Sequence, residues 1–436
     1  MSATDSSAPP AEREWFGQPR GLTILFLTEM WEVFSFVGMR TMLVYYMTKQ
    51  LLFEQQAASL TYGLYTGFVY LTPIIGGAIA DRLLGRRRAV ILGGSIMAVG
   101  HFLMMFEGLF LPALATVAIG NGFFLPSLPS QIPALYASND PRRQSAYSVY
   151  YMGKNLGAFL APLVCGTLGE LVGWHWGFGA AGVGMCLGLA IYILGRRHLP
   201  ADPPRRALTR GAAKPTTDMK RRIVVLTAVA LSVVLFRSAY EQTGNSVSLW
   251  IDSGVDRSVF GAAIPMTWFQ SINPLLVFVL TPILIVWWTG KAKLGREPEP
   301  LTKMAMGAGM VAAAYMLLSI VSLVSTQMDV KPIWIWPMLF FMLLTLGELY
   351  ILPIGLGLFG RVAPAALTAT VISFWYLTSF GGNFLAGVLG TLWSQMAPQV
   401  FFACIASVAA VSCLFLMALR GAARGIEEPA EGAVRV

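Results

Sequence analysis

The chain has 436 residues, of which 56% are hydrophobic and only 12% are charged; the formal net charge is +9 and the mean hydropathy is +0.64. Soluble proteins carry about 25% charged residues. This composition excludes a soluble protein, because so few polar side chains could not cover its surface in water. We therefore expect an integral membrane protein.

Twelve long apolar runs follow one another along the chain, and short polar loops separate them. A spanning helix needs about 20 apolar residues, whereas a transmembrane barrel has alternating segments of about ten. The runs therefore predict helices. The polar tail before Gly21 has no signal peptide's apolar stretch or cleavage site, so we expect the first run to be retained. The runs lie near residues 21–48, 57–80, 88–108, 110–136, 144–170, 174–195, 222–251, 262–289, 303–325, 332–360, 366–392 and 398–420.

The Lys and Arg residues gather on one predicted side of the membrane. Of 31, three fall on the other side and three inside helices, which leaves 25 on the first. The positive-inside rule makes that side cytoplasmic, and an even number of helices then places both termini there. We expect a multi-pass protein of the cytoplasmic (inner) membrane. The charges sit in separate short loops, so a nucleic-acid partner is not expected.

The longest polar stretch, His198 to Lys220, divides the chain into six runs and six runs. The expected fold is all-α, with two six-helix bundles as in the major facilitator superfamily, where substrate binds between the halves. No strong repeat relates the halves, so this step rests on counting. The expected parts are a cytoplasmic tail (1–20), a first bundle (21–197), a cytoplasmic linker (198–220), a second bundle (221–421) and a cytoplasmic tail (422–436).

The loop after the second run resembles the cytoplasmic gating signature of that superfamily. Its glycines allow helices to approach closely, and its acid can pair with an Arg or a helix N-terminus when the cytoplasmic side closes. An ordinary basic loop is the alternative. The candidate gate residues are Gly77, Asp81, Arg82, Gly85 and Arg86.

Seven ionisable side chains fall well inside the predicted helices, where an ionised group costs at least about 2.5–3.5 kcal/mol and so has a function or a partner. Four acids against three bases leave one negative charge, which protonation of one Glu would neutralise. A proton-coupled carrier could use this balance, although a structural ion-pair network would give the same count. The seven are Glu29, Glu32, Arg40, Lys154, Arg237, Glu241 and Glu348.

Helix geometry adds detail to five of these positions. Glu29 and Arg40 fall within about 20° of each other around a helix, on a face that must point to a cavity or a partner helix. Arg237 and Glu241 are i,i+4 neighbours and are predicted to pair, although this pair could be purely structural. Glu348 lies in a helix that we expect Pro353 to break, which makes it a candidate for binding a substrate ammonium.

Motifs over nearly the whole chain identify it as similar to the proton-dependent oligopeptide transporter (POT/PTR) family. The segment Glu29-Met30-Trp31-Glu32-Val33-Phe34-Ser35-Phe36-Val37-Gly38-Met39-Arg40 resembles the first-helix signature E-x-x-E-R-F-x-Y-Y-G-M-R. The further matching segments, in order, are 70–73, 120–124, 150–157, 240–244, 269–274, 347–353, 374–375 and 382–387.

The resemblance implies a symporter that takes up di- and tripeptides with protons. It implies proton coupling at Glu29 and Glu32, joined by Glu241, whose counterpart pairs with a fourth-helix lysine. It implies that Glu348 binds the amino terminus of the peptide. The expected substrate-binding residues, to which we add Lys154 and Arg237 from the charge analysis, are Arg40, Tyr70, Lys154, Asn155, Arg237, Asn273, Glu348, Trp375 and Ser379.

Two cations of the family pattern are absent. Val33 stands where the signature has arginine, and Leu125 stands where the fourth helix has lysine. Arg237 and Lys154 are the new cations, and we interpret this as relocation, with Arg237 as the new partner of Glu241. The family's extra pair of helices between the halves is missing as well, since the linker is too short and polar to span a bilayer.

We therefore expect a transporter and not an enzyme, because no nucleophile–base pair is present. No metal or cofactor is expected, because the three histidines and four cysteines have no ligand spacing. A sensor would need a signalling domain. The expected partners are a short peptide or peptide-like substrate, protons and the lipid bilayer, with a monomer as the assembly. Two alternatives remain open: a carrier of a modified amino acid or similar compound without a conventional carboxylate, and an uncoupled facilitator.

Overall fold

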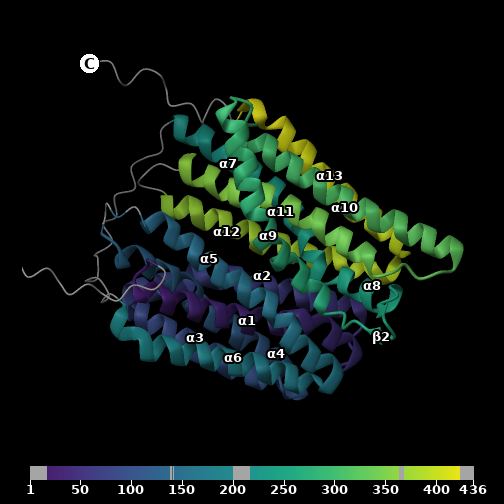
Figure 1. Ribbon diagram of the computed structural model, residues 1–436, viewed down its shortest axis with the longest axis horizontal. Helices are drawn as coiled ribbons and strands as arrows, with labels where there is room; N and C mark the ends of the chain where they lie inside the picture. The colour runs from purple at the N-terminus through teal and green to yellow at the C-terminus, as the bar shows by residue number, and fades with distance from the viewer. Residues whose placement is uncertain (1–16, 138–139, 141, 200–216, 363–367, 423–436) are drawn as a thin grey trace, which may run out of the picture.

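The computed structural model describes residues 17–137, 140, 142–199, 217–362 and 368–422. Long helices dominate, and the strands among these residues form one hairpin with two residues in each strand (Figure 1). The elements of the first half are α1 (Arg20–Lys49), α2 (Gln55–Ile79), α3 (Arg86–Leu103), α4 (Phe110–Ser127), α5 (Arg142–Ala161) and α6 (Trp174–Gly195). Those of the second are α7 (Thr217–Tyr240), α8 (Ser246–Gly254), β1 (Ser258–Val259), β2 (Ala262–Ala263), α9 (Trp268–Lys293), α10 (Pro300–Met328), α11 (Ile335–Val362), α12 (Thr368–Gly390) and α13 (Pro398–Ala418).

Ten helical segments of the described chain are long and apolar enough to cross a membrane. This confirms a multi-pass helical membrane protein. The predicted runs 88–108 and 366–392 form α3 and α12, which are not among the ten. The count of twelve spans therefore stays a prediction.

The buried side chains form two separate hydrophobic cores. One is built from residues between Leu22 and Leu199, and the other from residues between Val225 and Leu416. In Figure 1 the purple to teal helices α1, α3, α4 and α6 lie on one side, and the teal to yellow helices α7, α10, α11 and α13 lie on the other. We refer to the two groups as the first and second halves.

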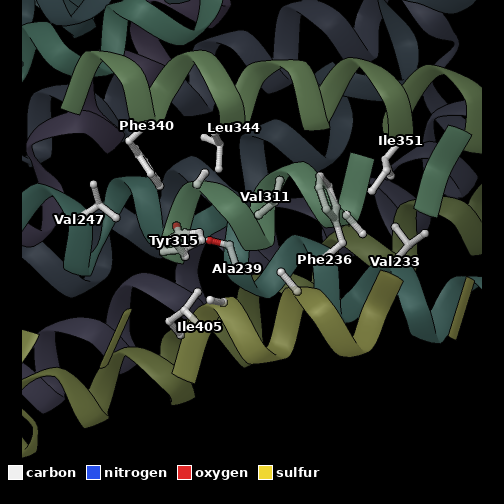
Figure 2. Packing of buried hydrophobic residues seen from close by; sticks show 14 of the residues in the cluster. Val233, Phe236, Ala239, Val247, Val311, Tyr315, Phe340, Leu344, Ile351 and Ile405 are labelled. Carbon is white, nitrogen blue, oxygen red and sulfur yellow. Dashed lines mark hydrogen bonds between the residues drawn. The ribbon is translucent and has the colours of Figure 1, made fainter. Parts of the chain in front are cut away.

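The second core fixes the end of α7 and the turn that follows it, which carry the candidate site residues Arg237 and Glu241. The Tyr315 hydroxyl on α10 donates a 2.7 Å hydrogen bond to the carbonyl of Ala239, and its ring packs edge-on against Phe340 (Figure 2). Phe236 and Val233 continue the same buried face of α7 (Figure 2). Arg237, Tyr240 and Glu241 are therefore held on a well-packed helix end.

The halves meet closely along α2 and α12. A Cβ atom at Gly63 would lie 2.4 Å from the Cα of Gly387, so only glycine permits this approach. Nearby, Gln55 Nε2 donates to the carbonyl of Gly390 at 2.8 Å, and Ser59 Oγ donates to Asn245 Oδ1 at 2.7 Å. These contacts lie toward the end of the molecule away from Arg86–Arg88, which we call the far end.

Two predicted helices differ from the sequence analysis. The run 222–251 is interrupted, because α7 ends at Tyr240 and a 3₁₀ turn, Glu241–Gly244, precedes α8. A Cβ at Gly244 would lie 2.1 Å from the Tyr62 hydroxyl, so the turn forms where α2 presses against it. The predicted break at Pro353 is wrong, because α11 continues through this residue.

Candidate functional site

Glu241 is the buried acid at which charges from both halves meet. The Arg40 guanidinium of α1 forms an ion pair with Glu241 Oε2, and Arg40 Nε donates to the Tyr62 hydroxyl at 2.9 Å. Arg237 Nη1 lies 3.7 Å from Glu241 Oε1. The predicted Arg237–Glu241 pair is thus confirmed, but Arg237 is the weaker of two partners. The relocation hypothesis missed Arg40, which pairs across the halves.

Arg40 cannot form an ion pair with Glu29, although both lie on one face of α1. Eleven residues separate them, which is about 16 Å along the helix. Glu29 instead accepts a 2.5 Å hydrogen bond from the Tyr150 hydroxyl of α5. The charges that the sequence places on one stripe therefore belong to two separate clusters.

Lys154 is the cation of the cluster that contains Glu29 and Glu32. It interacts electrostatically with both carboxylates, which are 2% and 3% exposed. The two helices are in direct contact here, since a Cβ at Gly157 would lie 2.1 Å from the Met30 carbonyl oxygen. Lys154 therefore supplies, from α5, a positive charge next to the position where Val33 has replaced the family's arginine.

Glu348 is held by neutral groups. Its Oε2 accepts hydrogen bonds from Asn273 Nδ2 at 2.8 Å and from the Tyr240 hydroxyl at 3.0 Å, and Thr345 supports Asn273. Its carboxylate is mostly buried; Arg237 interacts with it electrostatically, but no cation lies within 4 Å of it in the described parts of the chain. Asn273 and Glu348 are thus brought together as the resemblance implied, and Tyr240 is a member that sequence reasoning missed.

The other predicted binding residues are joined less directly to these clusters. Tyr70 interacts electrostatically with both Arg40 and Lys154. Asn155 donates to the Tyr151 carbonyl of its own helix at 2.9 Å. Trp375 is buried against Phe359, and a Cβ at Gly355 would lie 2.2 Å from its ring.

Ser379 is also buried on α12, where its carbonyl accepts a hydrogen bond from Asn383. Apart from these clusters, a cavity of about 560 Å³ opens beside α1, α5 and α6. Its lining, including Met30, Trp31 and Trp176, is apolar and contains none of the predicted site residues. The chemistry of the site therefore lies in the charge clusters and not in this cavity.

The predicted gate loop forms a π-helical turn, Ala80–Leu84, followed by Gly85 in a left-handed conformation with φ +82°. Gly77 packs against Pro126, and Arg86 Nη1 donates to the Ser130 carbonyl at 2.9 Å. Arg82 is exposed at this turn. The side chain of Asp81 lies outside the described residues, so a gating role stays a prediction.

Comparison with known proteins places these features in a family. A family model described as the POT family matches residues 87–215 and 206–404. The chain belongs to the POT family. It is 31% identical to the peptide transporter YePEPT of Yersinia enterocolitica, over 95% of this chain and 96% of that one. The family members are transporters, so this POT chain is a transporter and not an enzyme.

Two solved structures are similar to this chain in their fold as well as in sequence. A crystal structure of a peptide transporter POT in complex with sulfate gives a TM-score of 0.89 at 28% identity, and covers 96% of this chain and 98% of that one. A POT family transporter in complex with 5-aminolevulinic acid gives a TM-score of 0.88 at 25% identity, with coverage of 94% and 98%.

Proposed function

We propose that this transporter imports di- or tripeptides, or peptide-like amines, together with protons, by alternating access of two six-helix halves. The observation that carries the proposal is Glu348, a mostly buried carboxylate held by Asn273 and Tyr240 without an ion pair among the described residues. A buried charge needs a counter-charge. A substrate ammonium would supply it.

Proton coupling is assigned to Glu29 and Glu32. Two carboxylates share one described cation, Lys154, so protonation of either neutralises this cluster. A proton that moves down 100 mV supplies about 2.3 kcal/mol. This energy supports roughly fifty-fold accumulation of substrate. Glu241 joins this role through its ion pair with Arg40, which links the two halves.

The substrate's negative end is the point at which this protein departs from the family pattern. Arg40 forms a close ion pair with Glu241. Lys154 acts on Glu29 and Glu32 without an acid within 4 Å among the described residues, is exposed, and lies among Tyr70, Tyr151 and Tyr376. We assign the anionic end to Lys154. One similar POT transporter has been solved with sulfate and another with 5-aminolevulinic acid. The second ligand favours retaining a modified amino acid as the alternative substrate class.

The orientation proposed for the protein follows from its basic loops. We place the ends with Arg86–Arg88 and Arg196–Arg197 in the cytoplasm, together with both termini, in the inner membrane. The far end then faces outward. In this arrangement the Asp81 loop closes the cytoplasmic side, and the protein works as a monomer.

Uptake of labelled dialanine into proteoliposomes, with and without an imposed inward proton gradient, tests the proposal. Accumulation driven by the gradient is expected. Equilibration that ignores the gradient would make the protein a peptide facilitator. If folded protein takes up no dialanine, conventional peptides are excluded, and 5-aminolevulinic acid is the next substrate to try.

We predict that Glu348→Gln weakens binding of amine-bearing substrates at least tenfold, because the amide keeps the hydrogen bonds to Asn273 and Tyr240 but has no charge for the ammonium. Binding of labelled dialanine to purified protein measures this. Asp256→Asn, at the far end and outside the site, is the control for removing a carboxylate, because the Asp256 carboxylate bonds within its own loop, to Ser258. Unchanged affinity in Glu348→Gln would remove the proposed role.

A further inference from the structure

The far end contains a polar contact between the halves that none of the site residues shares. Glu170 lies in the π-helical turn Leu168–Val172 of the first half. Its Oε1 accepts hydrogen bonds from the backbone N–H of Thr267 at 2.8 Å and from the Thr267 hydroxyl at 2.6 Å, and its Oε2 accepts from the Met266 N–H at 3.0 Å. Thr267 is the N-cap residue of α9, in the second half.

This carboxylate acts as the N-terminal cap of a helix in the other half. The first N–H groups of a helix have no partner within it, and negative charge is favourable beside them. A cap usually comes from the residue just before the helix. Here the Thr267 side chain makes no capping bond to its own helix. The first half therefore supplies the cap.

Charged side chains extend the contact. Arg257 lies 3.9 Å from Glu170 and 3.2 Å from Asp252, and Lys49 of α1 lies 3.1 Å from Asp252. Signs alternate along this row, and it joins the halves at two places. The side chains of Glu170 and Asp252 are each only 9% exposed, so water screens these attractions less than on an open surface.

The fit of the backbone is equally close. A Cβ at Gly166 would lie 2.2 Å from the Thr267 hydroxyl oxygen, so only glycine allows Thr267 to reach Glu170. The Trp268 indole N–H donates to the Thr167 hydroxyl at 2.7 Å, and Ser271 donates to the Phe159 carbonyl at 2.8 Å. The start of α9 is thus bonded to the first half at successive levels.

We infer that Glu170 is a releasable cap: it latches the far end shut by holding the start of α9, and it leaves α9 when that end opens. This inference rests on the proposed alternating access. Separation of the halves exposes the capped N–H groups and the carboxylate to water. The latch therefore sets how much of the protein is closed at the far end, without contacting the substrate.

Spin-label distances across the far end test the latch directly. Labels are attached to Gln56→Cys and Ala262→Cys, which are exposed in the two halves, after replacement of the four native cysteines. The unmodified latch is expected to give mainly a short distance. Glu170→Gln, which loses the charge, should raise the longer-distance population at least threefold.

Asp256→Asn is the matched control. Asp256 lies at the same end, but its carboxylate bonds to the hydroxyl and N–H of Ser258 in its own loop, and these bonds hold its pKa below the usual range. Its removal takes away a negative charge without touching the contact between the halves. The distance distribution should stay that of the unmodified latch.

Gly166→Ala provides a second variant that keeps every charge and pushes Thr267 away from Glu170. Gly166→Ala should give the same shift to longer distances as Glu170→Gln. If Glu170→Gln does not fold, Gly166→Ala alone tests the latch. If either variant folds and its distance distribution equals that of Asp256→Asn, the inference that Glu170 is a latch is wrong. The measurement needs no substrate, so a latch that opens while dialanine is not transported would leave the inference standing and remove only the proposed substrate.

Discussion

At the scale of single residues, Glu241 is the position where one side chain connects the two halves. Arg40 reaches it from α1 and Arg237 from the preceding turn, while the acid itself is 1% exposed. Loss of one partner from a buried pair leaves an uncompensated charge, which costs about 3–5 kcal/mol. The two arginines are not equal partners, and their removal should show this.

Arg40→Ala should lower the stability of the detergent-solubilised protein by about 3 kcal/mol, the low end of that range, because Arg237 remains. Arg237→Ala should cost less, because its contact is longer. Glu241→Gln combined with Arg40→Ala should recover part of the loss. Thermal unfolding followed by tryptophan fluorescence measures these three variants and the single variant Glu241→Gln. Strict additivity of the Arg40 and Glu241 changes would contradict the pair.

The sequence contained one of these pairs and not the other. Spacing of i,i+4 predicts Arg237–Glu241, because a helix alone brings these side chains together. The Arg40 contact depends on how the halves pack, which no local pattern encodes. Tyr150 and Tyr240 lay inside matched motifs, but their hydroxyls were not assigned because no charge marked them.

At the scale of elements, small residues decide how closely the helices approach. Along α5, Gly153 and Gly157 face the backbone of α1, with a Cβ at Gly157 placed 2.1 Å from the Met30 carbonyl oxygen. This contact keeps Lys154 next to Glu29 and Glu32. The spacing of the charges therefore depends on a glycine that carries no chemistry.

Gly157→Ala should separate α5 from α1, destabilise the protein by about 1–3 kcal/mol and impair coupling of uptake to the proton gradient. Gly357→Ala on α11 is the matched change, because a Cβ there has nothing within 4 Å. It should be neutral or up to about 1 kcal/mol stabilising, since alanine favours helix. Thermal unfolding compares the two. Equal effects would mean that the approach of α5 to α1 is not tight.

Hydropathy predicted the helical segments well, because burial in a membrane leaves long apolar runs. It failed where a tertiary contact decides the backbone. The turn at Glu241–Gly244 forms against Tyr62. The polar segment 241–246 marks its place in the run 222–251, but a hydropathy average over the whole run hides it. Conversely, Pro353 signals a break that α11 does not make.

At the scale of the whole molecule, two separately packed cores face each other across glycine-lined contacts. Gly63 and Gly387 let α2 and α12 approach backbone to backbone, beside the hydrogen bonds of Gln55 and Ser59. The count of runs and the polar linker predicted two halves. The contact between the halves could not be predicted, because nothing in the sequence distinguishes Gly63 and Gly387 from the many other glycines of the chain.

Gly63→Leu should act as a wedge in this contact and reduce uptake more than tenfold, because the far end could no longer close. Gly290→Leu, where a Cβ has nothing within 4 Å, should leave uptake unchanged. The same spin labels at positions 56 and 262 should report longer distances in Gly63→Leu alone. Normal uptake in that variant would mean that transport does not require this contact.

The continuity of α11 through Pro353 has a mechanical consequence. Pro353 has no backbone N–H, so the Leu349 carbonyl lacks its usual partner in the helix. We therefore expect α11 to bend most easily at this point. Before this point, Glu348 is anchored by Asn273 and Tyr240; beyond it, Gly355 rests against Trp375. The segment of α11 after Pro353 can therefore bend relative to the segment that carries Glu348, while Glu348 keeps its hydrogen bonds.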